Sequence, residues 1–194
     1  MERTGDLPGR ERKMIDMILL VIAKLLAGWL IADLLGGVLH WLEDRVLTER
    51  TPFLGATVVA SNRLHHREPM AFAARSVVAR NGTTWLAAGV VSLMWLALFG
   101  PSLVWFSATI GGAVSSSVHF LTHQPRLSNR AIRILQEIGL VQSAAHHAGH
   151  HRPPSNRRYC PLTSWVNPVV DGFGIWRLLE QALHAIGIPL AIDA

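Results

Sequence analysis

Apolar residues are concentrated in three long runs, and polar connections rich in arginine separate them. The runs cover residues 17–39, 83–99 and 102–121. Crossing the hydrocarbon core of a bilayer takes roughly 20 apolar residues, so each run has about the necessary length. Gly100 and Pro101 lie between the last two runs and predict a tight turn there. The pattern therefore predicts three membrane-spanning helices, of which the second and third form a helical hairpin.

Two shorter segments also have helical periodicity. Residues 128–145 begin with a serine and an asparagine that can cap a helix, and their apolar residues recur near helical spacing. Residues 152–167 are rich in proline and predict a loop. Residues 169–186 carry one apolar stripe and predict either an interfacial helix or a fourth span. Alternating runs typical of strands are absent. We therefore expect an all-α, polytopic membrane helical bundle of three or four spans.

The chain divides into one large domain with two short ends. Residues 1–16 form a polar N-terminal segment whose charges of both signs do not resemble a cleaved signal peptide. Residues 17–187 form the membrane domain, and residues 188–194 a C-terminal tail. The single cysteine, Cys160, excludes an intrachain disulfide and leaves the redox compartment open.

The net charge of +5 does not indicate nucleic-acid binding, because the arginines lie in the connections between apolar runs. Residues 41–82 and 122–160 each carry six arginines, which is the pattern of cytoplasmic loops. A two-span hairpin between these connections keeps both on one side of the membrane. We therefore expect an integral membrane protein whose active site lies on the cytoplasmic face of the membrane. In a bacterium this would be the inner membrane. The side of the N-terminus stays open, since one span would place its basic residues outside.

Histidine is the residue that carries the candidate chemistry, because nine of ten histidines fall into four clusters. An i, i+4 pair of possible ligands is followed by a His-His pair, and this order occurs twice. Residues four apart share one helix face, whereas adjacent residues diverge by about 100° and can serve two metals. The predicted ligands are His40, His65, His66, His119, His123, His146, His147, His150 and His151. The sequence thus predicts a histidine-rich cap that holds two metal ions.

Four further polar residues accompany these clusters. Asp44 lies four residues after His40 and is expected to bind metal or to orient a histidine. Asn62 can hold a water, orient a histidine or cap a helix. Asn167 and Asp171 are expected to order the last loop through hydrogen bonds. His146 is open between a ligand and a supporting role.

The donor set narrows the chemistry. Imidazole suits zinc, copper, iron and nickel, but structural zinc sites usually contain cysteine, and the HExxH pattern of metalloproteases is absent. Two iron ions that bind O2 can remove hydrogen from an unactivated C–H bond, and a membrane supplies lipid chains. Lipid desaturation is the leading hypothesis. A lipid hydroxylase and a non-enzymatic membrane metal-binding protein are the alternatives.

The combined motifs resemble one family. They comprise His40-Trp41-x-x-Asp44, His65-His66-x-x-Pro69, His119-x-x-x-His123, His146-His147-x-x-His150-His151 and Tyr159-Cys160-x-x-Thr163-x-x-x-Asn167-Pro168-x-x-Asp171. From about residue 33 to 180, the chain resembles the plasmanylethanolamine desaturase family, also called Kua or CarF-like. The resemblance implies a di-iron centre, O2 as co-substrate and a membrane phospholipid substrate. Animal and myxobacterial members form a vinyl ether bond, whereas the plant branch desaturates an acyl chain.

A separate protein is expected to donate the electrons. The chain contains no haem, flavin or iron–sulfur motif that could deliver electrons to the metals. A ferredoxin-like partner, or a cytochrome b5-like partner with its reductase, is therefore expected.

Overall fold

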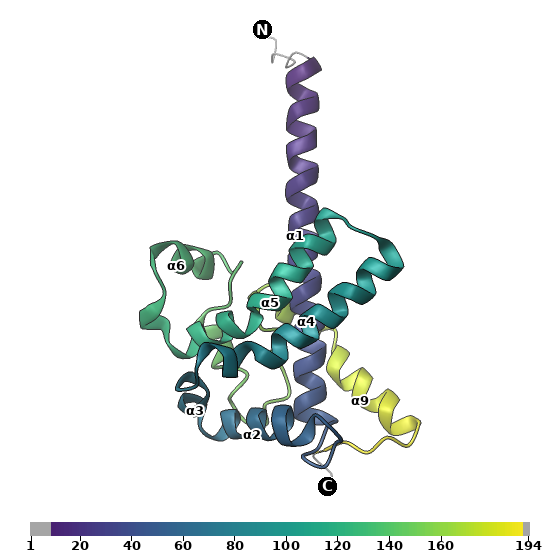
Figure 1. The fold of residues 1–194 in the computed structure, drawn as a ribbon, viewed down its shortest axis with the longest axis vertical. Coiled ribbons are helices and arrows are strands. Elements are labelled where there is room, and N and C mark those ends of the chain that lie inside the picture. The colour runs from purple at the N-terminus through teal and green to yellow at the C-terminus, as the bar shows by residue number, and fades with distance from the viewer. Residues whose placement is uncertain (1–8, 192–194) are drawn as a thin grey trace.

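One long helix forms the axis of the molecule, and two more form a hairpin that leans against it (Figure 1). The computed structural model describes residues 9–191. Helix α1, Gly9–Arg45, has 37 residues and is about 55 Å long. The hairpin consists of α4, Val77–Phe99, and α5, Leu103–His123. The described residues contain no strand, so the expected all-helical fold is confirmed for this part of the chain.

Two helices are long and apolar enough to cross a membrane, namely α1 and α4. Helix α5 has 21 residues but carries several serines, and it lies between the other two. The hairpin turns at Gly100, whose φ of +72° favours glycine, and at Pro101. The side chain of Ser102 accepts a hydrogen bond from the backbone N–H of Trp105 and so caps α5. The predicted hairpin is therefore present.

Helices α1 and α5 approach each other closely because small residues line their contact. A Cβ atom at Gly28 would lie 2.2 Å from the carbonyl oxygen of Val104. The hydroxyl of Ser107 donates a hydrogen bond of 2.6 Å to the carbonyl of Leu25. Such close backbone contact is typical of helix pairs in membranes. It fixes the register that brings the C-terminal ends of both helices, with their histidines, together.

The polar connections fold into short helices around the C-terminal end of α1. The first connection contains a π-helix η1, Gly55–Val59, and helices α2, Ala60–Arg67, and α3, Pro69–Ala73. The remainder of the chain contains a 3-10 helix η2, Pro125–Leu127, and helices α6, Arg130–Glu137, α7, Ala144–His147, α8, Val166–Gly172, and α9, Ile175–Ala185. These elements carry the remaining histidines to the end of α1.

The single helix expected over residues 128–145 is wrong. Asn129 does cap a helix, since its Oδ1 accepts a hydrogen bond of 2.9 Å from the backbone N–H of Ile132. That helix, α6, ends at Glu137 because Gly139 adopts a φ of +79°, which stops helical propagation. The chain then turns and begins α7 at Ala144.

The segment 169–186 is also broken, at Gly174, which has a φ of +63°. The helix that follows, α9, has only 11 residues and is about 16 Å long, which is too short to cross a bilayer. The described residues therefore contain no fourth span in this segment. The predicted terminal segments stay a prediction, and residues 1–8 and 192–194 lie outside the described residues. Residues 9–16 continue α1, and Ala191 donates a backbone hydrogen bond to Arg45.

Candidate metal centre

The histidine clusters converge into two adjoining groups of possible ligands. The five-histidine group contains His65, His119, His123, His147 and His151. The mixed group contains His40, Asp44, His66 and His150. Within each group, one ligand atom from every residue lies within 4.8 Å of all the others. Four separate segments of the chain contribute, so the fold itself assembles the site.

In the five-histidine group, the Nε2 atoms face one another at short distances. His119 Nε2 lies 2.9 Å from His65 Nε2 and 3.1 Å from His123 Nε2. His147 Nε2 lies 3.0 Å from the Nε2 atoms of both His123 and His151. Nitrogens that bind one ion at roughly 2.0–2.1 Å, about 90° apart, lie about 3 Å from each other. The spacing thus fits a single metal ion among five imidazoles.

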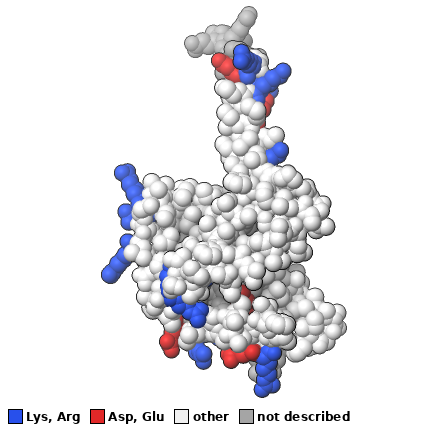
Figure 2. All heavy atoms as spheres, viewed as in Figure 1, with Lys and Arg blue, Asp and Glu red and all other residues white. Residues whose placement is uncertain are grey.

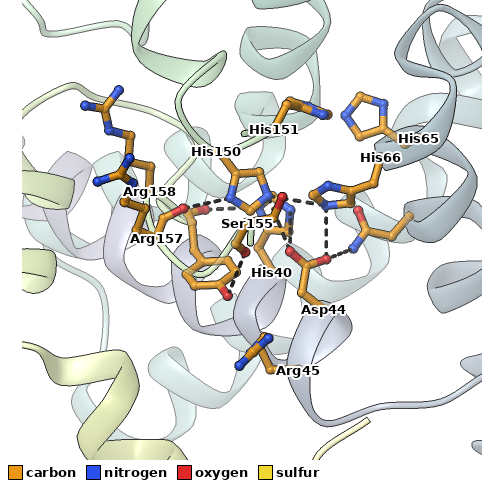
Figure 3. A network of polar contacts seen from close by, with 12 residues as sticks. His40, Asp44, Arg45, His65, His66, His150, His151, Ser155, Arg157 and Arg158 are labelled. Atoms are coloured by element: carbon orange, nitrogen blue, oxygen red, sulfur yellow. Dashed lines mark hydrogen bonds and ion pairs between the residues drawn. The ribbon is translucent and has the colours of Figure 1, made fainter. Parts of the chain in front are cut away.

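The mixed group combines three histidines with one carboxylate (Figure 3). Asp44 Oδ1 lies 3.2 Å from His66 Nε2, and Asp44 Oδ2 lies 3.3 Å from His150 Nε2. Nε2 of His40 lies 3.8 Å from Asp44 Oδ2 and is buried without a hydrogen-bond partner. A buried polar atom without a partner is costly, and a bound metal would satisfy it. The donor set therefore fits a second ion.

Backbone carbonyls set the tautomers of two histidines in the mixed group. His40 Nδ1 lies 3.1 Å from the carbonyl oxygen of Tyr159, and His150 Nδ1 lies 2.8 Å from that of Arg157. A carbonyl only accepts hydrogen bonds, so each Nδ1 must carry the proton. The lone pair of each neutral ring is then on Nε2, which faces the other ligands in Figure 3. Partners of this kind orient metal-binding histidines in proteins.

Burial keeps the histidines neutral. Burial, followed by the neighbouring imidazoles, lowers the pKa of His65 from 6.5 to about 2. The same two causes lower the pKa of His151 to about 3, and that of His147 well below its usual value. Protonated rings could not sit this close together in a low-dielectric site. At neutral pH these rings therefore present free lone pairs, which metal binding requires.

Local helical geometry explains the distribution on α5 and α2, whereas His150 and His151 lie in the turn beyond the end of α7. His119 and His123 lie four residues apart on α5 and belong to one group, as do His147 and His151. The adjacent pair His65 and His66 on α2 diverges, so that each ring enters a different group. Adjacent His150 and His151 divide in the same way. Each group draws on both repeats of the box pattern, so one repeat does not correspond to one metal.

His146 is the one predicted ligand that lies outside both groups. Its Nε2 lies 3.1 Å from Nδ2 of Asn167. The Asn167 side chain also accepts a hydrogen bond from the backbone N–H of Cys160 and donates one to its carbonyl. Asp171 accepts hydrogen bonds from the backbone N–H of Arg158 and from Nε1 of Trp176. These three residues order the last loop, whereas Nδ2 of Asn62 donates to Oδ1 of Asp44 within the mixed group.

Sequence patterns alone assigned no role to several residues that contact the site. The ring of Phe72, on α3, stacks on His119 with a centroid distance of 4.9 Å and lies 5.1 Å from the ring of His65. It covers the five-histidine group on that side. Tyr159 and Arg157 act through their carbonyls. Since every residue has a carbonyl, no sequence signal could have identified these two roles.

Comparison with known proteins gives a consistent result. The chain is 30% identical to a probable fatty acid desaturase of Acanthamoeba polyphaga mimivirus, over 85% of this chain and 84% of the viral protein. It is 27% identical to plasmanylethanolamine desaturase 1 of Mus musculus, over 86% and 66% of the two chains. It is 32% identical to the chloroplastic fatty acid desaturase 4-like 1 of Arabidopsis thaliana, over 81% and 54%. No solved structure matches the chain.

The chain thus spans most of the viral protein but about two-thirds or less of the mouse and plant proteins. The sequence model of the lipid desaturase domain family matches residues 29–188 of this chain. This range includes every residue of both ligand groups. The chain therefore belongs to the lipid desaturase domain family.

Proposed function

We propose that this chain is an integral-membrane, O2-dependent di-iron desaturase that introduces a double bond into an alkyl or acyl chain of a phospholipid. One observation carries the proposal: two adjoining sets of convergent ligand atoms lie at the ends of long apolar helices. Membership of the lipid desaturase family supports the choice of reaction. The arginine-rich connections around the site support a cytoplasmic position.

The residues have distinct parts in this proposal. The five-histidine group would hold one iron and the mixed group the other. When bound, paired irons and O2 supply the oxidant that removes hydrogen from a C–H bond. The carbonyls of Tyr159 and Arg157 hold His40 and His150 with Nε2 free, and Asn62 holds the Asp44 carboxylate. His65, His147 and His150 are buried, and the other six ligands are partly buried.

We take a plasmanylethanolamine-type lipid, with formation of a vinyl ether bond, as the leading substrate and product. The name of the mouse relative supports this choice. An acyl chain is the second candidate, because the viral and plant relatives are called fatty acid desaturases. A hydroxylase would use the same metals but leave oxygen on the lipid. Electrons would come from a separate ferredoxin-like or cytochrome b5-like partner.

The test is lipid mass spectrometry of cells that express the chain and contain plasmanyl lipids. Wild type and His184→Ala should form the double bond, because His184 is exposed on α9 and lies outside both groups. His119→Ala should insert normally yet form no product, because His119 belongs to the five-histidine group. Purified wild-type protein should contain two irons per chain.

Three outcomes would contradict the proposal. Full product formation by His119→Ala at normal abundance would refute the di-metal reaction. A hydroxylated lipid in place of the unsaturated one would favour the hydroxylase. A single zinc per chain, with no change in the lipids, would indicate a non-enzymatic membrane metal-binding protein.

A further inference from the structure

The N-terminal part of α1 extends far beyond the tip of the α4–α5 hairpin (Figure 1). Near the start of α5, Ser107 bonds to the carbonyl of Leu25, and Val104 lies against Gly28. The tip of the hairpin is therefore level with about residues 25–28 of α1. The 16 residues Gly9–Lys24 lie beyond that level, and every one of them is exposed. At about 1.5 Å per residue, they extend roughly 24 Å past the hairpin.

This extension is apolar around its whole circumference. Its large exposed residues are Met14, Ile15, Met17, Ile18, Leu19, Leu20, Val21 and Ile22, which together cover all faces of the helix. A helix that docks on a protein carries one apolar stripe, whereas a helix surrounded by lipid is apolar on all sides. Figure 2 shows a mostly uncharged rod, with most of its charged residues gathered toward its end. The extension carries Arg10, Glu11, Arg12, Lys13 and Asp16 toward that end, and Lys24 at the level of the hairpin tip. Lipid hydrocarbon is therefore the occupant that fits this surface.

The tip of the hairpin is also suited to hydrocarbon. Residues 81–118 contain no Asp, Glu, Lys or Arg. Leu98 and Phe99 beside the turn are 70% and 72% exposed. The turn also leaves few free donors: the N–H of Gly100 bonds to Leu96, Pro101 has no N–H, and Ser102 caps α5. A loop that ended in water would be expected to carry more polar residues.

We infer that α1 alone crosses the bilayer, and that α4 and α5 form a re-entrant hairpin that turns back inside the hydrocarbon. The N-terminal end of α1 lies roughly 24 Å beyond the hairpin tip, and this distance is most of the roughly 30 Å thickness of the hydrocarbon core. If the hairpin tip reached the far surface, the apolar extension of α1 would lie in water. In our arrangement Gly9 and the histidine cap are on opposite faces of the membrane. This replaces the expectation of three full spans and assigns a side to the N-terminal end of α1.

The experiment measures the accessibility of single cysteines in the full chain. Pro101→Cys marks the hairpin tip, Arg12→Cys the end of α1, and Arg130→Cys the histidine side. Native Cys160 is fully buried, so the wild type gives the background. A membrane-impermeant maleimide is applied to sealed spheroplasts and, separately, to inverted membrane vesicles. A nitroxide at position 101 then reports its exposure to O2, which enters hydrocarbon, and to a water-soluble nickel complex.

The expected result is labelling of Arg12→Cys from one side only and of Arg130→Cys from the other only. Pro101→Cys should not be labelled from either side of the membrane, and it should be labelled after the protein is unfolded in detergent. Its nitroxide should collide with O2 more often than with the nickel complex. Labelling of Pro101→Cys from the Arg12 side would show that the hairpin crosses fully. Its labelling from the Arg130 side would place the tip in water. Labelling of both control positions from one side would show that α1 does not cross. None of these readouts depends on desaturase activity, so the inference and the proposed function fail separately.

Discussion

Asp33, buried in α1, accepts three hydrogen bonds from the loop that contains Cys160, two of them from Thr163. The backbone N–H of Thr163 donates at 3.0 Å and its hydroxyl at 2.6 Å, and the backbone N–H of Leu162 donates at 2.6 Å. The same loop contains Tyr159, whose carbonyl orients His40. An apolar helix thus holds the loop that supports the metal centre.

Asp33→Asn should weaken both the fold and the mixed group. The amide replaces one acceptor oxygen with a donor that faces N–H groups, and hydrogen bonds to a charged group are worth about 1.5–3 kcal/mol. We expect a lower melting temperature in detergent and less bound iron. Asp16→Asn is the matched control, because Asp16 is an exposed carboxylate on the same helix. Equal melting temperatures for the two variants would show that Asp33 does not anchor the loop.

Adjacent residues His146 and His147 should behave differently when each is replaced by alanine. His147 belongs to the five-histidine group, whereas His146 faces Asn167. His147→Ala should therefore lose iron and product, while His146→Ala should keep iron close to the wild-type amount. Metal analysis of the two purified variants, with lipid profiles of the same cells, provides the measurement. Comparable iron loss in both would mean that His146 is a ligand.

Asn62→Ala should lower metal affinity without removing a ligand. The Asn62 amide bonds to Asp44 Oδ1 and fixes the direction of that carboxylate. Loss of a residue that orients a ligand typically costs 10–100-fold in metal affinity or activity, and we expect about that reduction here. Competition with a chelator gives the affinity, and Asp44→Ala sets the limit for loss of the carboxylate itself. An unchanged metal affinity in Asn62→Ala would show that Asn62 is not needed to orient the Asp44 carboxylate.

The metal-free protein should lose stability as pH falls below about 6.5. In the folded state the pKa values of His65 and His151 are lowered to about 2 and 3, whereas the unfolded chain titrates near 6.5. Between these values the unfolded chain binds more protons, so acid favours unfolding. Each such histidine contributes a slope of up to about 1.4 kcal/mol per pH unit. The contribution is complete above pH 6.5 and declines toward pH 3.

Melting temperatures of the metal-free protein between pH 7.5 and 5, a range we choose to bracket the ordinary histidine pKa, test this dependence. His151→Gln cannot titrate and should show a shallower decline than wild type. Parallel curves for the two proteins would contradict the assignment of low pKa to His151.

The sequence by itself determined what depends on local geometry. The apolar runs and the turn at Gly100 predicted the hairpin, and a capping residue predicted the start of α6. Helical periodicity predicted the pairing of His119 with His123 on one face. It also indicated that adjacent His65 and His66 would face different ways. These features follow from 3.6 residues per turn, which acts over one or two turns of the chain.

Only the tertiary structure decided which histidines share a group. His66 lies with His40 and His150, which are distant in sequence, because α2 and the turn after α7 fold against the C-terminal end of α1. The left-handed backbone at Gly139 breaks the helix expected there, and the Asn167 loop keeps His146 outside both groups. The hairpin's reach along α1 is likewise set by packing at Gly28. Such contacts join segments far apart in the chain, so the spacing of residues along the sequence does not encode them.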